Sequence, residues 1–198
     1  MKGEPLELLT DEQLVSLTRS GNQDAFNRLA SRWEGSLYRF VRRTIGNSED
    51  ARDVCQEALI KAYQNVDRLR EGAKFKPWLH HIALNICRDR FRSAKTKGDS
   101  FSIDDAKPAE LSNEGIQEST EHGAITGDIG ELLGSFLDTL PMEQKTCLLL
   151  REYHGFNSEE ISEITGVPPG TVRTRIFYGL KAVRKKMSQR GLSVSDFQ

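Results

Sequence analysis

Apolar residues in this chain recur every three or four positions, and this spacing restricts the possible fold more than any other sequence feature. The pattern is clearest over residues 23–45, where one helical face would carry Phe26, Leu29, Ala30, Trp33, Leu37, Phe40 and Val41. A period of 3.6 residues places such positions on one side of an α-helix, whereas a half-buried β-strand needs apolar residues at every second position. No segment shows that alternation. We therefore expect an all-α fold.

Polar residues and glycines mark where the expected N-terminal helices begin and end. Thr10 and Gln13 have the spacing of a capping box for a short first helix. Gly46 ends the second helix, and Asn47 or Ser48 caps a third. The inner face of the third helix holds Ala51, Val54, Cys55, Ala58, Leu59 and Ala62. A charged loop over residues 67–76 then leads through Pro77 into a fourth helix over residues 78–92.

The C-terminal part is also expected to be helical. Its predicted helices cover residues 132–140, 142–153, 158–164 and 170–187. Asn157 and Glu160 form a second cap pair, and Gly166 provides a turn before the prolines at 168 and 169. A short helix, a glycine-containing turn and a longer basic helix are typical of the helix-turn-helix motif.

Charge divides the chain into three parts, although the net charge of all 198 residues is only -1. Residues 11–97 hold 17 basic and 11 acidic side chains, a net charge of +6, and residues 98–137 hold 1 and 9, a net charge of -8. Residues 98–130 also lose the apolar periodicity. We therefore predict two small helical domains, 1–97 and 131–198, joined by a flexible acidic linker over 98–130. Each basic domain could bind a polyanion.

Several classes of protein are excluded. No apolar run is long enough for a membrane span and no signal peptide is recognised, so we expect a cytoplasmic protein. Cys55, Cys87 and Cys147 lie far apart in helical patterns, which favours buried free thiols over disulfides, with redox sensing as a less favoured alternative. Adjacent His80 and His81 point to different helix faces and make no metal site. Sequence signatures of enzymes are absent, so no catalytic residue, cofactor or metal is expected.

Two groups of residues have the chemistry of nucleic-acid binding. At the start of the last helix, the side chains able to reach a major groove are Thr171, Arg173, Thr174, Arg175, Phe177, Tyr178 and Lys181. Before and within the fourth helix, cations and aromatics interleave at Lys74, Phe75, Lys76 and Trp78, a pattern that suits an unpaired base and its phosphate. Phe75 and Trp78 could instead be core residues. Asn85 could read a base edge or bond to a neighbouring helix.

Three segments together resemble a known family. They are DARDVCQEALIKAYQ (50–64), FKPWLHHIALNICRDRFR (75–92) and SEEISEITGVPPGTVRTRIFYGLKAVRKK (158–186). In this order they are similar to bacterial sigma factors of the extracytoplasmic-function (ECF) class within the sigma-70 family. Residues 11–97 resemble region 2 and residues 131–190 resemble region 4.

The resemblance implies a factor that binds core RNA polymerase, directs it to promoters and helps to open the duplex. The family's surface for the clamp of the largest polymerase subunit matches Asp53, Gln56, Glu57 and Lys61; the flap of the second-largest subunit is a further implied partner. The minus-10 segment matches Lys74, Phe75, Lys76, Trp78, Asn85 and Arg88. The minus-35 helix matches Thr171, Arg173, Thr174, Arg175, Phe177, Tyr178 and Lys181. Control by an anti-sigma factor is implied in the same way.

Some positions depart from the family pattern. Pro168 and Pro169 replace a usual small polar and acidic pair, and Tyr178 stands where many members have arginine, so the contact expected there is open. Two other functions remain: a helix-turn-helix regulator that binds DNA without polymerase, and a sigma-like decoy that binds a regulator. Neither needs both a polymerase-binding stripe and a strand-opening platform, and no dimerisation helix is apparent for the first.

Overall fold

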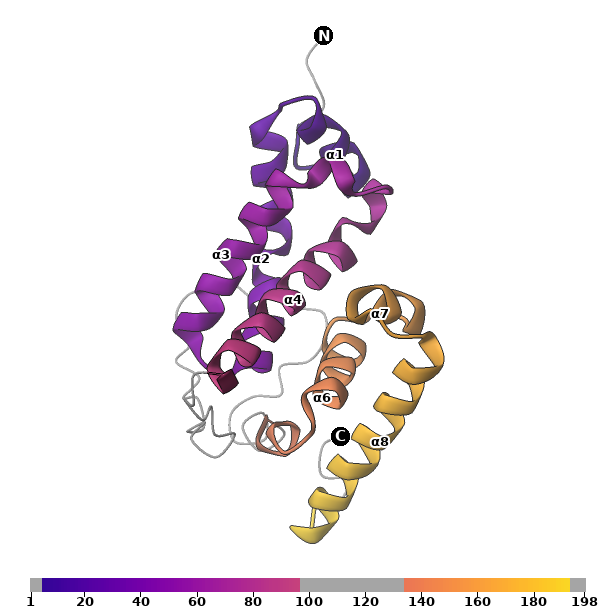
Figure 1. Cartoon of the computed structure of the whole chain (residues 1–198). Coiled ribbons are helices and arrows are strands. Elements are labelled where there is room, and N and C mark those ends of the chain that lie inside the picture. The colour runs from indigo at the N-terminus through magenta and orange to yellow at the C-terminus, as the bar shows by residue number, and fades with distance from the viewer. Residues whose placement is uncertain (1–4, 97–133, 193–198) are drawn as a thin grey trace.

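A computed structural model describes residues 5–96 and 134–192, and within these ranges all regular structure is helical (Figure 1). The fold class predicted from the apolar spacing is confirmed. The N-terminal half contains α1 (Asp11–Arg19), α2 (Gln23–Ile45), α3 (Ser48–Gln64) and α4 (Phe75–Thr96). Two 3₁₀ turns, Val66–Arg68 and Gly72–Lys74, join α3 to α4. The predicted linker and both domain boundaries beside it lie outside the described residues.

The C-terminal half begins, among the described residues, with a short helical segment over 134–138. It continues with α6 (Met142–Leu148), a π-helical turn η4 (Leu149–Tyr153), α7 (Ser158–Thr165) and α8 (Pro169–Gln189). The segment predicted as a single helix over 142–153 is therefore α-helical up to Leu148 and continues as a π-helical turn to Tyr153. Such single wide turns inside helices are uncommon and often lie at functional positions.

The predicted caps are present. Thr10 accepts from the backbone N–H of Gln13 while the Gln13 side chain accepts from that of Thr10, which completes the capping box. Asn47, not Ser48, caps α3. The pair Asn157 and Glu160 caps α7 in the same reciprocal manner. These side chains satisfy backbone donors that the first turn of a helix leaves free, so helix starts were readable from local chemistry.

The start of α4 differs from the sequence prediction. The helix begins at Phe75 rather than at residue 78, and much of the predicted loop is 3₁₀ helix. Pro77 therefore lies inside the first turn of α4 and does not open it. Proline is tolerated there because the backbone N–H that it lacks would have no intrahelical partner.

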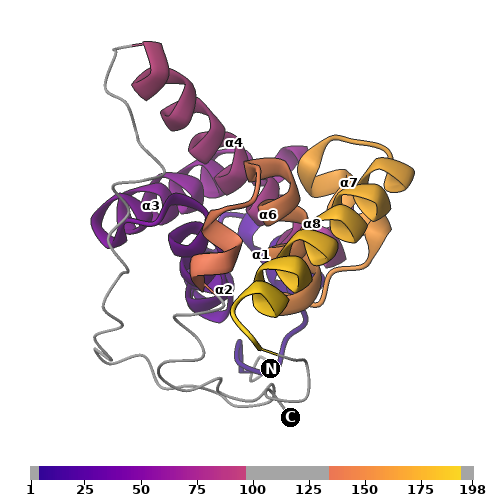
Figure 2. The same ribbon diagram turned by 90° about the horizontal axis from the view of Figure 1, so that it is seen from below.

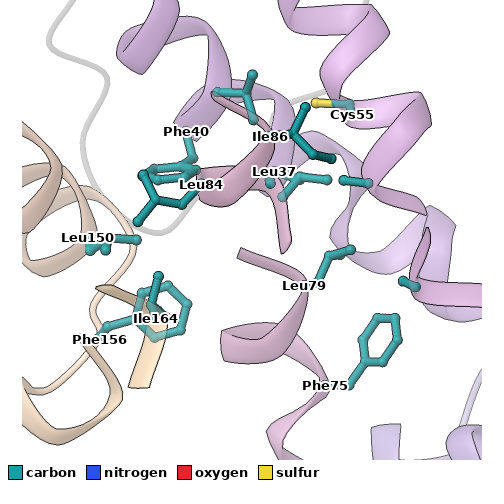
Figure 3. Packing of buried hydrophobic residues seen from close by; sticks show 14 of the residues in the cluster. Leu37, Phe40, Cys55, Phe75, Leu79, Leu84, Ile86, Leu150, Phe156 and Ile164 are labelled. Carbon is teal, nitrogen blue, oxygen red and sulfur yellow. The ribbon is translucent and has the colours of Figure 1, made fainter. Parts of the chain in front are cut away.

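The core is continuous across the two halves. The buried faces of α2 and α3 pack against α4, whose other side meets α7. In Figure 3, Phe40 and Leu84 of the N-terminal half lie opposite Leu150, Phe156 and Ile164 of the C-terminal half. All five side chains are buried. The halves thus share one apolar seam.

The helix α4 lies between the other helices of the two halves. Figure 1 places α3 on one side of it and α7 on the other, and the view from below in Figure 2 agrees. The helix α8 packs on α6 and α7, farther from the N-terminal half. This order leaves one face of α8 exposed while α7 is held between α8 and α4. None of the described helices is both long and apolar enough to span a membrane.

A close contact at Gly179 gives the first prediction. A Cβ atom at Gly179 would lie 2.7 Å from Leu148 Cδ1, whereas a Cβ atom at Gly170 on the same helix would meet nothing within 4 Å. We expect Gly179→Ala to be about 1–3 kcal/mol less stable than Gly170→Ala, because overpacking opposes the gain in helix propensity that both share. Chemical denaturation of the two variants measures the difference. Equal stabilities would contradict the close packing of α6 on α8.

Candidate nucleic-acid interface

One face of α8 presents polar, basic and aromatic side chains to solvent. Phe177 is 62% exposed and Tyr178 is 53% exposed, although aromatic residues of this size are usually buried. The other exposed candidates on this helix are Thr171, Arg173, Thr174 and Lys181. Six of the seven residues predicted to reach a major groove therefore share an accessible surface.

Arg175 is the exception on α8. Its side chain is half-buried, and its positive charge partly opposes the rise that burial causes in the pKa of the Cys147 thiol of α6. Arg173 is exposed and lies 3.9 Å from Glu159 of α7, a weak surface ion pair that nucleic acid could replace. The Thr174 hydroxyl donates to the Gly170 carbonyl at 3.0 Å. The start of α8 is thus ordered by local contacts and remains open to a partner.

The stripe predicted on α3 lies on the outside of the molecule. Asp53, Gln56 and Lys61 are exposed, and Glu57 is half-buried. Lys61 pairs with Glu57 at 2.8 Å, one helical turn away. Arg90 of α4 approaches Glu57 at 3.7 Å and Asp50 at 3.5 Å, which ties the stripe to the next helix.

The residues predicted as a stacking platform are divided by the structure. Phe75 is fully buried and packs edge-on to Phe26, so it belongs to the core and does not offer its face to a base. This corrects its assignment as a DNA contact, and the reason is that α4 begins at Phe75 and turns that side chain inward. Trp78 packs against the core but is only half-buried, so it remains partly accessible. The core alternative was therefore correct for Phe75 and in part for Trp78.

A cleft of about 300 Å³ opens between α3 and α4. This volume is at the lower end of the range for small-molecule pockets. Its lining combines an aromatic ring, amides, cations and aliphatic side chains: Lys61, Asn65, Arg68, Trp78, His81, Ile82, Asn85, Ile86 and Asp89. Trp78 and Asn85, predicted separately from sequence, are thus brought to one hollow, and an unpaired base could stack and hydrogen-bond there.

His81 is a member of this site that sequence reasoning missed. Its Nδ1 donates to the Ile164 carbonyl at 2.8 Å, which leaves Nε2 to accept from the Asn85 side-chain amide at 3.0 Å. Asn85 Oδ1 in turn lies 3.5 Å from the Arg88 guanidinium. The spacing of four residues between His81 and Asn85 was the available signal, because such residues are neighbours on a helix surface.

Further polar contacts connect α4 and the 3₁₀ turn before it to the C-terminal half. Arg88 donates to the Thr165 carbonyl at 3.1 Å, and Lys74 pairs with Glu163 at 2.8 Å. Lys76 donates to the His154 carbonyl at 3.1 Å, with its ammonium 4.5 Å from the centre of the Phe156 ring. Burial lowers the pKa of Lys76, and the negative charges of Glu160 and Asp11 partly oppose this shift.

Two buried histidines meet at the same seam. The rings of His80 on α4 and His154 after η4 lie 5.3 Å apart, and the Nε2 atom of each is buried without a hydrogen-bond partner in the described structure. Burial lowers the pKa of His80 to about 4. Burial, aided by the charges of His80, Lys76, Arg39 and Arg43, lowers that of His154 to about 3. Both rings are therefore neutral at pH 7.

The three thiols are buried and free, as predicted. Burial raises the pKa of both Cys55 and Cys87 to about 12, and it also raises the pKa of Cys147. Because thiolate is the reactive form of cysteine, these protonated thiols are poorly reactive at neutral pH. Redox sensing by these thiols has no support in their surroundings.

Comparison with known families and proteins agrees with this geometry. Residues 29–97 match the family model for sigma-70 region 2, and residues 130–183 match the model for sigma-70 region 4. The ECF RNA polymerase sigma-E factor of Escherichia coli K12 is 32% identical over 184 residues, covering 91% of this chain and 96% of that protein. The chain belongs to the ECF sigma factors. The sigma-E factor of Haemophilus influenzae is 30% identical with 91% and 97% coverage.

Two solved structures share the fold. CnrH, solved in complex with the cytosolic domain of CnrY, superimposes with a TM-score of 0.65 at 22% identity, covering 90% of this chain and 97% of CnrH. The sigma factor RpoE of Bartonella quintana, solved with the anti-sigma factor NepR, gives a TM-score of 0.64 at 21% identity, with coverage of 82% and 96%. The family models and the sigma-E relatives together make the chain an alternative sigma factor, and promoter-directed transcription initiation is its function.

The buried histidines of this sigma factor predict an acid-sensitive fold. An unfolded histidine gains a proton near pH 6.5, whereas these two gain one only near pH 4 and 3 when folded. Their contribution to stability is therefore present above pH 6.5 and is lost as the pH falls toward 4. Each proton taken up only on unfolding costs about 1.4 kcal/mol per pH unit.

The test compares the wild-type protein with His154→Gln, which keeps a polar group near Ser36 but does not titrate. We expect the free energy of unfolding, measured by urea denaturation from pH 7.5 to 4.5, to fall more steeply for the wild type. The difference in slope should approach about 1.4 kcal/mol per pH unit. Parallel slopes would contradict a neutral, buried His154.

Proposed function

We propose that this sigma factor binds core RNA polymerase through the exposed stripe of α3 and reads a two-part promoter with α4 and α8. The minus-10 element would be opened at α4 and the minus-35 element would be read by α8. The observation that carries this proposal is the cleft between α3 and α4, in which Trp78 and Asn85 lie together. In these terms residues 1–97 form the polymerase-binding and melting domain, 98–130 the linker, and 131–198 the minus-35 domain.

The chemistry of the cleft supports strand opening. A partly exposed indole offers a surface for stacking, and an amide beside it can donate to and accept from a base edge. Lys76 and Arg88 of α4, with Lys74 in the 3₁₀ turn just before it, supply positive charge for the phosphates of the displaced strand. Stacking compensates part of the cost of unpairing a base, so the cleft favours the open duplex over the closed one.

The geometry of α8 supports major-groove reading. The exposed residues Thr171, Thr174 and Tyr178 follow each other at helical spacing and share a face with the exposed cation Lys181. The exposed Arg173 lies beside this face, one turn from Phe177. Hydroxyls and guanidinium groups read base edges or phosphates, and the ring of Phe177 can contact thymine methyl groups. Because α4 and α8 belong to one chain, binding of one promoter element raises the effective concentration of the other helix near its own element. The overall affinity therefore exceeds that of either contact alone, provided that both elements are bound together.

We also propose that an anti-sigma protein controls this sigma factor. We propose further that the sigma factor acts in the cytoplasm, where polymerase and promoters are. The support for control by an anti-sigma protein is the solved structure of Bartonella quintana RpoE, which is a complex of a sigma factor with an anti-sigma factor. The clamp of the largest polymerase subunit would bind the α3 stripe, and the flap of the second-largest would bind the C-terminal domain.

Transcription in vitro tests the whole proposal. Purified core RNA polymerase, a library of promoter fragments and this protein as the sole specificity factor should give specific starts that share an upstream two-part element. Absence of both transcripts and core binding would instead favour a stand-alone DNA-binding regulator or a decoy.

Variants of the cleft should separate promoter opening from polymerase binding. We expect Trp78→Ala and Asn85→Ala to reduce open-complex formation on a selected promoter at least tenfold, because stacking and base-edge bonds are each worth about 1–3 kcal/mol. Core binding should be unchanged. Ser93→Ala, at an exposed position of the same helix, is the matched control. Permanganate footprinting of unpaired thymines measures opening, and wild-type footprints from both cleft variants would contradict the assignment.

A charge reversal tests the polymerase-binding stripe. We expect Asp53→Arg to weaken the affinity for core polymerase at least tenfold, since a stripe that holds two carboxylates implies a basic partner surface. Ser31→Arg places the same charge on an exposed position of α2 and should bind core as the wild type does. Fluorescence anisotropy of labelled sigma factor with core measures both. Equal loss in the two variants would point to a general charge effect.

A further inference from the structure

The helix α1 is bonded to the segment that joins α3 to α4. Arg19, the last residue of α1, has its Nε atom 3.3 Å and one terminal nitrogen 3.4 Å from the Val66 carbonyl oxygen, and the same terminal nitrogen donates to the Leu69 carbonyl. A guanidinium carries several N–H donors in one fixed plane, so a single side chain can hold two acceptors at once. Arg19 thereby links two backbone positions that lie 47 and 50 residues further along the chain.

The two bonded carbonyls lie at the ends of the first 3₁₀ turn. This turn covers Val66–Arg68, and Leu69 follows it directly. Val66 and Leu69 are buried, whereas Asn65 and Arg68 line the cleft between α3 and α4. The turn therefore gives one set of side chains to the core and another to the cleft. A shift of its backbone would move Asn65 and Arg68 relative to Trp78, which lines the cleft from α4.

The two cleft residues beside this turn have groups that suit a nucleotide. The Asn65 side-chain amide donates to the Lys61 carbonyl at 2.8 Å, which leaves the amide oxygen as an acceptor for the N–H of a base. Arg68 is exposed, and its guanidinium can form two parallel hydrogen bonds to a phosphate. Neither residue was among those predicted from sequence to contact DNA.

A close backbone contact holds the second 3₁₀ turn against the same helix. Gly72 is buried, and a Cβ atom at this position would lie 2.9 Å from the Cα atom of Glu12 in α1. A larger residue would not fit there without a shift of backbone. The two turns are short, and 3₁₀ hydrogen bonds have poorer geometry than those of an α-helix. The shape of the whole connection therefore depends on its contacts with α1.

We infer that Arg19 is a positioning residue for the cleft that receives the unpaired minus-10 base. Arg19 is not among the residues that line the cleft, and it acts through the turn that it holds. Groups of a binding site need to be kept within about 0.5 Å of their productive positions, and a turn without its brace does not provide this for Asn65 and Arg68. The helix α1 thereby takes part in strand opening. This inference rests on the proposed assignment of the cleft to a minus-10 base.

Holoenzyme assembled from core polymerase and each variant tests the positioning role. The DNA is a promoter selected by the transcription assay, with its minus-10 region unpaired by mismatches so that the cost of opening does not enter the measurement. One version has an intact non-template strand. A second version lacks one base, at the position where removal of the base weakens binding by the wild type most. Fluorescence anisotropy at matched salt measures the affinity for each DNA.

The expected effect of Arg19→Ala depends on the presence of the base. We expect this variant to bind the intact strand at least fivefold more weakly than the wild type does, and to bind the strand that lacks the base within about twofold of the wild type. The reason is that the second DNA has no base for the cleft to hold. Arg19→Ala combined with Trp78→Ala should bind the intact strand no more weakly than Trp78→Ala alone, since both residues act on one site. Binding of core polymerase should be unchanged.

Asn22→Ala is the control for a purely structural effect. The Asn22 side chain accepts from the Ala25 N–H at 3.1 Å and caps α2, so its loss destabilises the same helical bundle without removing a contact to the turn. This variant should bind both DNAs within about twofold of the wild type. A base-dependent loss as large as that of Arg19→Ala would show that lower stability is sufficient, and it would overturn the inference.

The remaining outcomes separate the inference from the proposed function. Arg19→Ala would overturn the inference if it weakened binding of both DNAs equally or of neither, or if its effect added fully to that of Trp78→Ala. A base-dependent loss for Trp78→Ala without one for Arg19→Ala would overturn the inference alone. If Trp78→Ala itself showed no base-dependent loss, the assignment of the cleft would fail and the inference would fail with it.

Discussion

The burial of α4 on two sides is the constraint on which the rest of this structure depends. One side completes the N-terminal bundle with Leu79, and the other meets the C-terminal half through Leu84 and His80. Because two sides of this 22-residue helix are buried, little of its surface is left to carry exposed polar side chains. Part of what remains is the strip that carries Trp78, Asn85 and Arg88, to which we assign the minus-10 strand.

The sequence was sufficient to predict helices and their ends, because these depend on neighbours along the chain. Thr10, Asn47 and Asn157 cap helices with side chains that bond to backbone groups two or three residues away. The predicted start of α4 is three residues late, because proline commonly opens a helix and Pro77 instead lies inside the first turn. Because proline is tolerated within the first turn of a helix, Pro77 does not determine where α4 begins. The start depends instead on the packing of Phe75 against Phe26, which lies in another helix.

The candidate site could be predicted in part for the same reason. Exposure of Phe177 and Tyr178 followed from the basic, polar character of α8, and the α3 stripe followed from helical periodicity. The cleft was not predictable, because it is formed by two helices whose relative position no local pattern determines. The contacts of His81 and Arg88 were also invisible in sequence, since their acceptors are backbone carbonyls 83 and 77 residues away. Backbone acceptors leave no side-chain signature.

The shared seam links the stability of the two halves. Because α4 side chains bond to the end of α7 and the apolar core runs through both halves, separation of the halves would expose apolar side chains of each to water. Each half alone is small, and small domains bury a lower fraction of their surface. A sigma factor whose halves are apart and not held by polymerase would therefore spend more time locally unfolded. Proteases act on such states, so the lifetime of the factor in the cell would depend on whether it is closed or bound.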